Sequence, residues 1–112
     1  MPLTIDSCVA QHIGDREEQQ DRVALFPHPD YKGAAMAVLA DGMGGLSGGS
    51  LAAEQVVLAS RNAFARFGPG GSVRELLTAA ICDAHDGIRL AALSSNLEPH
   101  STACVLVLQP GR

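Results

Sequence analysis

The sequence is poor in aromatic residues and contains no tryptophan. Three phenylalanines and one tyrosine make up 4 % of the 112 residues, whereas apolar residues together make up 46 %. A core of this composition is built mainly from aliphatic and alanine side chains, which favours helices layered on a sheet over aromatic pockets. Long hydrophobic runs are also missing, because the longest, residues 34–40, is far shorter than the roughly 20 residues that cross a bilayer. We therefore expect no membrane partner.

Basic residues are too few and too scattered for a nucleic-acid-binding surface. Eight Lys and Arg residues stand against twelve Asp and Glu residues, which gives a net charge of −4. No window collects the basic residues into a stripe, so binding to backbone phosphates is disfavoured. The first residues lack the basic and apolar segments of a secretory signal, and we expect a cytoplasmic location.

The cysteines and histidines show no metal-ligand or disulfide pattern. Three cysteines at long spacings, without a Cys-x-x-Cys pair, argue against a disulfide framework and against structural zinc. We expect all three to be small buried thiols: Cys8, Cys82 and Cys104. The four histidines are equally scattered, and each is expected to be structural or exposed: His12, His28, His85 and His100.

Hydrophobic periodicity predicts four strands and two helices. Alternation or continuous apolar runs indicate strands over residues 3–9, 22–26, 34–40 and 102–108, of which 34–40 is an interior strand. Helical spacing indicates amphipathic helices over residues 51–67 and 73–93. Ser72 and Glu75 match a capping box at the start of the second helix, and Gly87 lies inside that helix without an explanation from the sequence.

This order of elements predicts an α+β fold. We expect a partial sheet of about four mostly antiparallel strands, with two antiparallel helices packed on one face. Such a sheet leaves long edges open, and no element after the last predicted strand protects its edge. We therefore expect copies of the chain to associate through these edges as a homo-oligomer.

A glycine-rich segment, residues 41–49, connects the interior strand to the first helix. It lacks the lysine of a phosphate-binding P-loop, and Ser47 stands where a dinucleotide fingerprint requires glycine. Asp41 comes directly after the buried strand, and Gly42 has no side chain to cover its carbonyl group. Two interpretations remain open: these oxygens bind a hard divalent cation, or Asp41 caps a tight turn that the glycines allow.

A second polar cluster, residues 14–22, precedes the second predicted strand. Glu17 and Glu18 are best interpreted as a solvated turn. Arg16 can hold a phosphate group with two hydrogen bonds, and Asp21 can support a metal ion or orient the arginine.

Together the two clusters resemble the metal-dependent serine/threonine phosphatases of type 2C, particularly bacterial members. The matching features extend over nearly the whole chain: Arg16, the stretch Gln19-Gln20-Asp21-Arg22, the strand ending in Asp41-Gly42-Met43-Gly44-Gly45, the pair Gly48-Gly49, and Ser101-Thr102-Ala103. The Asp-Gly-Met-Gly-Gly sequence at the end of a strand is the most specific of them.

This resemblance implies a role for each matched residue. Asp41 would bridge two Mg or Mn ions, the Gly42 carbonyl would bind one of them, Asp21 would support the site, and Arg16 would bind the substrate phosphoryl group. Two such ions activate a bridging water and stabilise the in-line transition state of phosphate ester hydrolysis. The substrate would be a phosphorylated protein, and the enzyme would oppose a serine/threonine kinase.

Several residues depart from the family pattern. Gln20 replaces a glutamate that binds metal in many members, and a neutral amide is a weaker ligand for a dication. Met43 stands where eukaryotic members have a histidine proposed as general acid. Leu46, Ser50 and Ala53 replace the His, Glu and Ser that are common in the glycine segment.

The resemblance further implies that residues 1–112 are the N-terminal part of a single catalytic domain of about twice this length, whose C-terminal half supplies further metal-binding aspartates. On that basis we expect the isolated chain to be inactive. The alternative is a noncatalytic phosphatase-like module that binds a partner or associates with itself.

Overall fold

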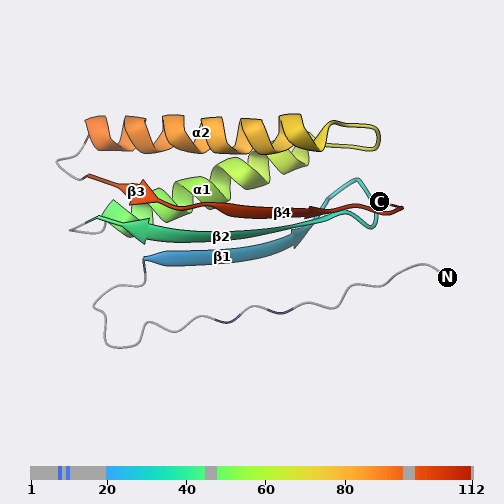
Figure 1. Ribbon diagram of the computed structural model, residues 1–112, viewed down its shortest axis with the longest axis horizontal. Coiled ribbons are helices and arrows are strands. Elements are labelled where there is room, and N and C mark those ends of the chain that lie inside the picture. The colour runs from blue at the N-terminus through green and yellow to red at the C-terminus, as the bar shows by residue number, and fades with distance from the viewer. Residues whose placement is uncertain (1–7, 9, 11–19, 45–47, 95–97, 112) are drawn as a thin grey trace.

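The structure is a computed structural model that describes residues 8, 10, 20–44, 48–94 and 98–111. It contains six elements in the order β1 (Asp21–Pro27), β2 (Ala35–Met43), α1 (Gly48–Ala65), α2 (Val73–Leu93), β3 (His100–Ser101) and β4 (Cys104–Leu108) (Figure 1). The strand expected over residues 3–9 lies, apart from Cys8, outside the described residues. Each of the other predicted elements is present within a few residues of its expected bounds.

The strands form one antiparallel sheet with β2 at its centre. β1 pairs with one side of β2, from Asp21 opposite Asp41 to Pro27 opposite Ala35. β3 and β4 pair with successive parts of the other side of β2. The last expected strand, 102–108, begins two residues too early, because β4 starts at Cys104 and residues 102 and 103 separate it from β3.

Helices cover one face of the sheet, and no described helix or strand packs on the other face. On β2 the buried side chains Met36, Val38 and Ala40 alternate with positions that are more exposed, and Leu39 between them is 54 % exposed. The continuous apolar run of this strand led us to expect an interior strand. That expectation is confirmed for its hydrogen bonding, since β2 has a neighbour on each side.

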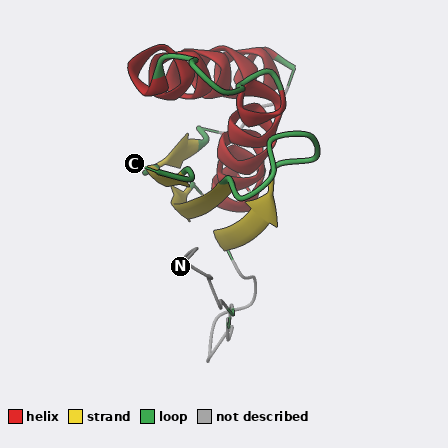
Figure 2. Cartoon of the chain, turned by 90° about the vertical axis from the view of Figure 1, so that its right-hand side faces the viewer, coloured by secondary structure: helices red, strands yellow, loops and turns green. Residues whose placement is uncertain are grey.

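The two helices form successive layers on the covered face. α1 lies directly on β1 and β2, and α2 runs back across α1 in roughly the opposite direction, with α1 between it and most of the sheet (Figure 2). The α+β fold expected from the sequence, with both helices on one face, is confirmed. Because α2 contacts little besides α1, only a narrow stripe of it is buried: Leu76, Ala80 and Ala84.

The sequence pattern overestimated the buried face of α2. Helical spacing places Ile81 on the same apolar side of α2 as Ala80 and Ala84, but Ile81 is 49 % exposed. An amphipathic pattern identifies which side chains share a helix face, whereas the width of the buried stripe depends on how many neighbours the helix has.

The aromatic residues gather at one end of the core, which the sequence predicted to consist mainly of aliphatic and alanine side chains. Phe64 is almost fully buried and lies near both Phe26 and Phe67. His28 packs edge-on against Phe64 at 4.9 Å between ring centroids. His28 Nδ1 also accepts hydrogen bonds from the backbone N–H groups of Asp30 and Tyr31, so this histidine is structural, as expected.

Local hydrogen bonding and close packing explain two details of α2. Ser72 Oγ accepts a hydrogen bond from the Glu75 N–H at 3.2 Å, which confirms the predicted cap. A Cβ atom on Gly87 would lie 2.5 Å from Oε1 of Gln55. Gly87 therefore leaves room for the end of the Gln55 side chain of α1, a contact that the sequence did not indicate.

The expectation of buried thiols is wrong, because all three cysteines are exposed: Cys8, Cys82 and Cys104. Cys82 lies on the part of α2 turned away from α1. Cys104 pairs with Leu39 on the open side of the sheet. Neither helix in the described part of the chain is long and apolar enough to cross a membrane.

Candidate functional site

The candidate site lies where β2 ends and the chain turns toward α1. Asp41 is exposed near the end of β2, and Asp21, the first residue of β1, is its direct partner in the antiparallel register. Directly paired residues project from the same face of a sheet. The two side chains therefore project from the sheet face away from α1, where Asp41 is exposed and Oδ1 of Asp21 is buried. They are the two residues that the sequence assigned to metal binding and its support.

Thr102 fixes the backbone of Asp41 through two hydrogen bonds. The N–H of Thr102 donates to the carbonyl oxygen of Asp41 at 3.0 Å. In return, the N–H of Asp41 donates to Oγ1 of Thr102, also at 3.0 Å. Thr102 occupies the interruption between β3 and β4, so its side chain takes over a hydrogen bond that a continuous strand would make with its backbone.

Gly42 is buried and lies against the first turn of α1. A Cβ atom on Gly42 would lie 1.9 Å from the carbonyl oxygen of Gly49 and 2.6 Å from that of Gln20. Both contacts are with backbone, which cannot move aside without displacing α1 or β1. Close packing thus requires glycine here, and the expected role of the Gly42 carbonyl as a metal ligand stays a prediction.

Gln20 holds the glycine segment from the helix side of the sheet. Its backbone oxygen accepts a hydrogen bond from the Gly42 N–H at 3.2 Å, and its side-chain Nε2 donates to the carbonyl oxygen of Gly44 at 3.0 Å. Its Oε1 lies beside Gly49. The Gln20 amide is thus directed toward the start of α1, whereas Asp21 and Asp41 project from the opposite face.

Of the residues assigned to the site, the structure therefore brings Asp21 and Asp41 together and directs the Gln20 side chain elsewhere. Arg16, expected to bind the phosphoryl group, lies outside the described residues. The sequence did not assign a role to Thr102 beyond its place in the Ser101-Thr102-Ala103 match. A polar β-branched residue at the start of an otherwise apolar run was the available signal for this contact.

The described residues by themselves do not form a site for two divalent cations. A pair of carboxylates is present, but in the described ranges no three Asp, Glu, His or Cys side chains come together as metal ligands. Mg and Mn favour several oxygen ligands with negative charge, and the neutral Gln20 side chain is held against the glycine segment, with Oε1 beside Gly49. Additional ligands would have to come from outside the described residues.

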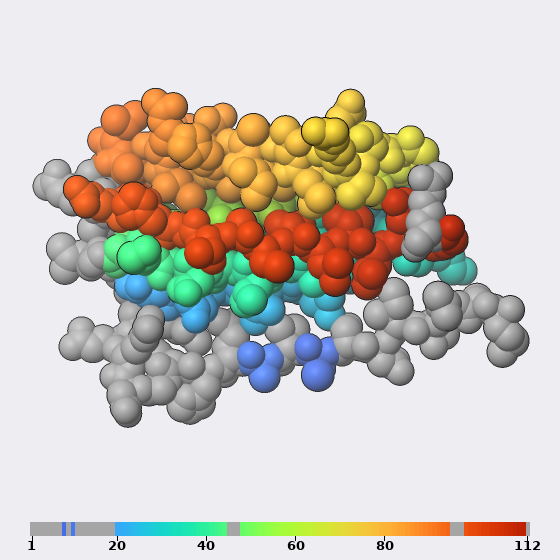
Figure 3. Space-filling view, viewed as in Figure 1, coloured from blue at the N-terminus to red at the C-terminus, as the bar shows by residue number. Residues whose placement is uncertain are grey.

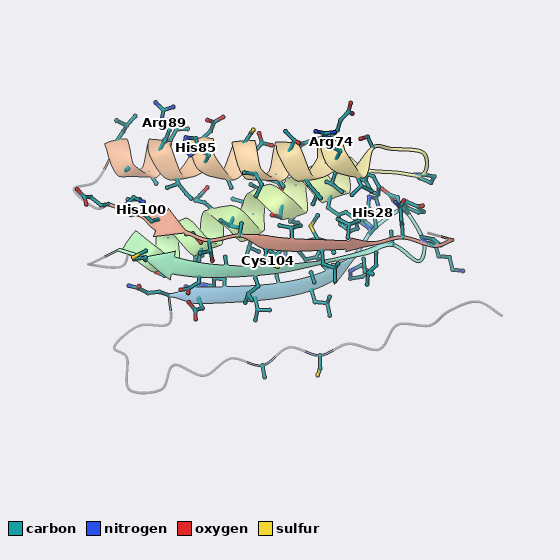
Figure 4. The ribbon with its side chains drawn as sticks, in the orientation of Figure 1. His28, Arg74, His85, Arg89, His100 and Cys104 are labelled. Atoms are coloured by element: carbon teal, nitrogen blue, oxygen red, sulfur yellow. The ribbon has the colours of Figure 1, made fainter. Side chains whose placement is uncertain are left out.

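A cavity of about 600 Å³ opens on the surface next to the candidate site. It lies between the second half of α2 and β3, and its lining includes His85, Arg89 and His100 (Figure 4). Ser101, which also lines it, pairs with Gly42 of β2. Asp41 is not part of the lining, so the carboxylate pair and this cavity are separate features of the same end of the molecule.

Comparison with known proteins supports the fold. No protein-family model matches the sequence, and no curated protein matches it. Among solved structures, the serine/threonine phosphatase of S. agalactiae superposes with a TM-score of 0.70 at 23 % sequence identity, over 96 % of this chain. The chain has the fold of part of a serine/threonine phosphatase.

The chain spans 43 % of the length of that phosphatase. The fold thus confirms the expected resemblance to a phosphatase fragment. Activity, metal dependence, substrate and partners are not established by a likeness in fold. The place of the chain as the N-terminal part of the domain, and its cytoplasmic location, stay predictions.

Proposed function

We propose that this chain is part of a metal-dependent protein serine/threonine phosphatase that hydrolyses phosphoserine and phosphothreonine on proteins. The observation that carries this proposal is the Asp21–Asp41 pair at the end of β1 and β2, within a fold shared with a serine/threonine phosphatase. Paired carboxylates on adjacent strands provide hard, anionic oxygen donors for Mg or Mn.

The residues around this pair support its use as a rigid site. Two hydrogen bonds to Thr102 fix the Asp41 backbone, and the glycine segment behind it is held by Gln20. A ligand that is held by its neighbours loses little conformational freedom when it binds an ion. In the complete enzyme, Mg or Mn would activate water for attack on the phosphate ester, and Arg16 would bind the phosphoryl group.

The chain of 112 residues should have little or no phosphatase activity by itself. Two carboxylates are too few to hold two dications against competition from water. The experiment is hydrolysis of p-nitrophenyl phosphate by this chain with Mn²⁺, with Asp41→Asn as the comparison. A rate at the level of the Asp41→Asn variant is expected, and strong activity that Asp41→Asn abolishes would contradict the claim that the described residues are an incomplete site.

Metal binding distinguishes this proposal from a noncatalytic module without a metal site. Calorimetric titration with Mn²⁺ should give weak binding to the unaltered chain and less binding to Asp41→Asn. Leu90→Glu is a suitable control for general electrostatic attraction, because it adds a carboxylate on the exposed part of α2, far along the chain from the pair. Equal binding by the unaltered chain and Asp41→Asn would favour the noncatalytic module.

The proposed physiological partners follow from the reaction. The substrate is a phosphorylated protein, and the enzyme reverses the action of a serine/threonine kinase. Two histidines and an arginine line the cavity between α2 and β3. The tests above use p-nitrophenyl phosphate and Mn²⁺ and do not require a particular phosphoprotein. We also propose that copies of the chain associate through the edges of β1 and β4 that pair with no described strand.

A further inference from the structure

Gln20 joins three parts of the chain on the helix side of the candidate site. Its backbone oxygen accepts a hydrogen bond from the Gly42 N–H at 3.2 Å, which continues the pairing of β1 with β2. Its side-chain Nε2 donates to the carbonyl oxygen of Gly44 at 3.0 Å. A Cβ atom on Gly49, in the first turn of α1, would lie 2.5 Å from Oε1 of Gln20. We call these contacts of Gln20 the latch.

The two described ends of the glycine segment meet at Gly44. Its carbonyl oxygen accepts a second hydrogen bond, from the Gly49 N–H at 3.3 Å. The φ angle of Gly44 is +151°, a backbone conformation that residues with a side chain rarely adopt. The Gly44 carbonyl group is therefore shared between the Gln20 side chain and α1, and the latch closes one end of the segment onto the other.

The contacts at position 20 require an amide group. An amide donates and accepts hydrogen bonds at the same time, whereas a carboxylate only accepts them. An apolar side chain of the same length would remove one of the two donors to the Gly44 carbonyl oxygen. The latch thus explains why glutamine is used here, and it directs this side chain away from Asp21 and Asp41.

We propose that Gln20 is a positioning residue of the candidate site, whose latch holds the glycine segment in place without a divalent cation. The side chain supplies no ligand to an ion at Asp41; it fixes the Gly42 backbone beside it. Without a latch, an ion would have to order this backbone when it binds, and ordering costs free energy of binding. The role of the latch in the reaction rests on the proposed function, whereas the latch itself does not.

The latch lies on the side of the sheet that α1 covers. Gly42, Gly48 and Gly49 are buried there, and Gln20 is half-buried. In the space-filling view, α1 shows only as a narrow strip between α2 and β4 (Figure 3). The contacts of the latch all join described residues, so they do not depend on what packs against the other face of the sheet.

Amide hydrogen exchange of this chain, followed by NMR in the presence of EDTA, tests the latch. The Gly42 and Gly49 amides should be protected without any divalent cation. Gln20→Met keeps the length of the side chain but removes the donor, so the Gly49 amide should exchange about fivefold faster, as for the loss of one hydrogen bond. The Gly42 amide should change less, because its acceptor is the backbone oxygen of Gln20.

Two controls separate the latch from a general loss of stability. The His28 N–H donates to the carbonyl oxygen of Ala34 at the other end of the sheet, and its exchange should not change in Gln20→Met. Gln55→Met is the matched substitution on α1, where Gln55 lies beside Gly87, and it should leave the Gly49 amide unchanged.

Nuclear Overhauser effects locate the Gln20 side chain without a substitution. In the unaltered chain, the Nε2 protons of Gln20 should show cross-peaks to the α protons of Gly49, because the amide group lies against this residue. Cross-peaks to Asp41 in their place would show a side chain turned toward the carboxylates. This measurement keeps the test decisive if Gln20→Met fails to fold.

A Mn²⁺ titration connects the latch to the site. In Gln20→Met, broadening of amide signals should still begin at Asp41 but should require about twofold or more Mn²⁺, because the ion must then order the Gly42 backbone. An equal requirement in both chains would overturn the positioning role. Unselective broadening in the unaltered chain would overturn the proposed function, while the exchange measurements decide the latch independently.

Three exchange results would overturn the latch. A Gly49 amide that is protected only after Mg²⁺ is added is ordered by the ion and not by Gln20. The same Gly49 exchange rate in Gln20→Met and the unaltered chain would show that the side chain does not hold the segment. Equal acceleration at Gly49 and His28 would show a general loss of stability without a local contact.

Discussion

Thr102 and Asp41 exchange two hydrogen bonds of 3.0 Å, and in one of them the hydroxyl of Thr102 replaces a backbone acceptor. This contact joins the interrupted third strand of the sheet to the residue on which the proposed function depends. Most hydrogen bonds within a sheet join backbone groups, which a substitution cannot remove. The bond to Thr102 Oγ1 involves a side chain, so a substitution can test it.

Thr102→Val should destabilise the fold by about 1 kcal/mol, because it removes the hydroxyl acceptor while keeping the shape of the side chain. Thr102→Ser keeps the acceptor and should cost less. The measurement is the free energy of unfolding in urea for both variants. Equal losses in the two variants would show that the hydroxyl contributes nothing to holding Asp41.

Two glycine substitutions should differ strongly in their effect. Gly42→Ala places a Cβ atom against backbone oxygens of Gly49 and Gln20 and should cost more than about 2 kcal/mol of stability. Gly87→Ala meets only the flexible end of Gln55, and it gains up to about 1 kcal/mol of helix propensity. Thermal unfolding of both variants checks this difference, and similar losses would contradict the close approach of α1 to Gly42.

Gln20→Glu should not restore a stronger metal site in this chain. The Gln20 amide donates to the carbonyl oxygen of Gly44, and a carboxylate would face that oxygen without a proton to donate. We expect lower stability and Mn²⁺ binding that stays weak, measured by urea unfolding and calorimetric titration. A clear gain in Mn²⁺ affinity with unchanged stability would show that the side chain at position 20 turns toward Asp41.

His28 should stabilise the aromatic cluster through both its ring and its Nδ1 atom. His28→Phe keeps an aromatic ring but leaves the N–H groups of Asp30 and Tyr31 without this acceptor, so we expect a loss of about 2 kcal/mol. His28→Asn retains an acceptor but loses the packing against Phe64. Urea unfolding compares the two, and a His28→Phe variant as stable as the unaltered chain would contradict the role of Nδ1.

Much of the fold could be predicted because its signals are local. The capping box at Ser72 and Glu75 fixed the start of α2, and the apolar run at residues 34–40 marked the central strand. The α+β arrangement followed from the order of elements. These features depend on residues that are close together in the sequence, so sequence patterns are sufficient to predict them.

The parts that were not predicted depend on contacts between distant segments. The partial burial of α2 results from its position over α1, and the exposure of Cys104 results from an open sheet face. Neither can be read from periodicity, which groups residues by face without identifying what covers that face. The orientation of Gln20 likewise depends on the approach of the glycine segment from more than twenty residues away.

The most direct test of the central claim, that Asp21 and Asp41 form the metal-binding side of a phosphatase site, is a Mn²⁺ titration followed by amide NMR signals. A paramagnetic ion broadens nearby signals even when it binds weakly, so activity is not needed. We expect the signals of Asp21, Asp41 and Thr102 to broaden first, and this selectivity to disappear in Asp41→Asn. Broadening that begins elsewhere in the chain, or that is unchanged in Asp41→Asn, would contradict the claim.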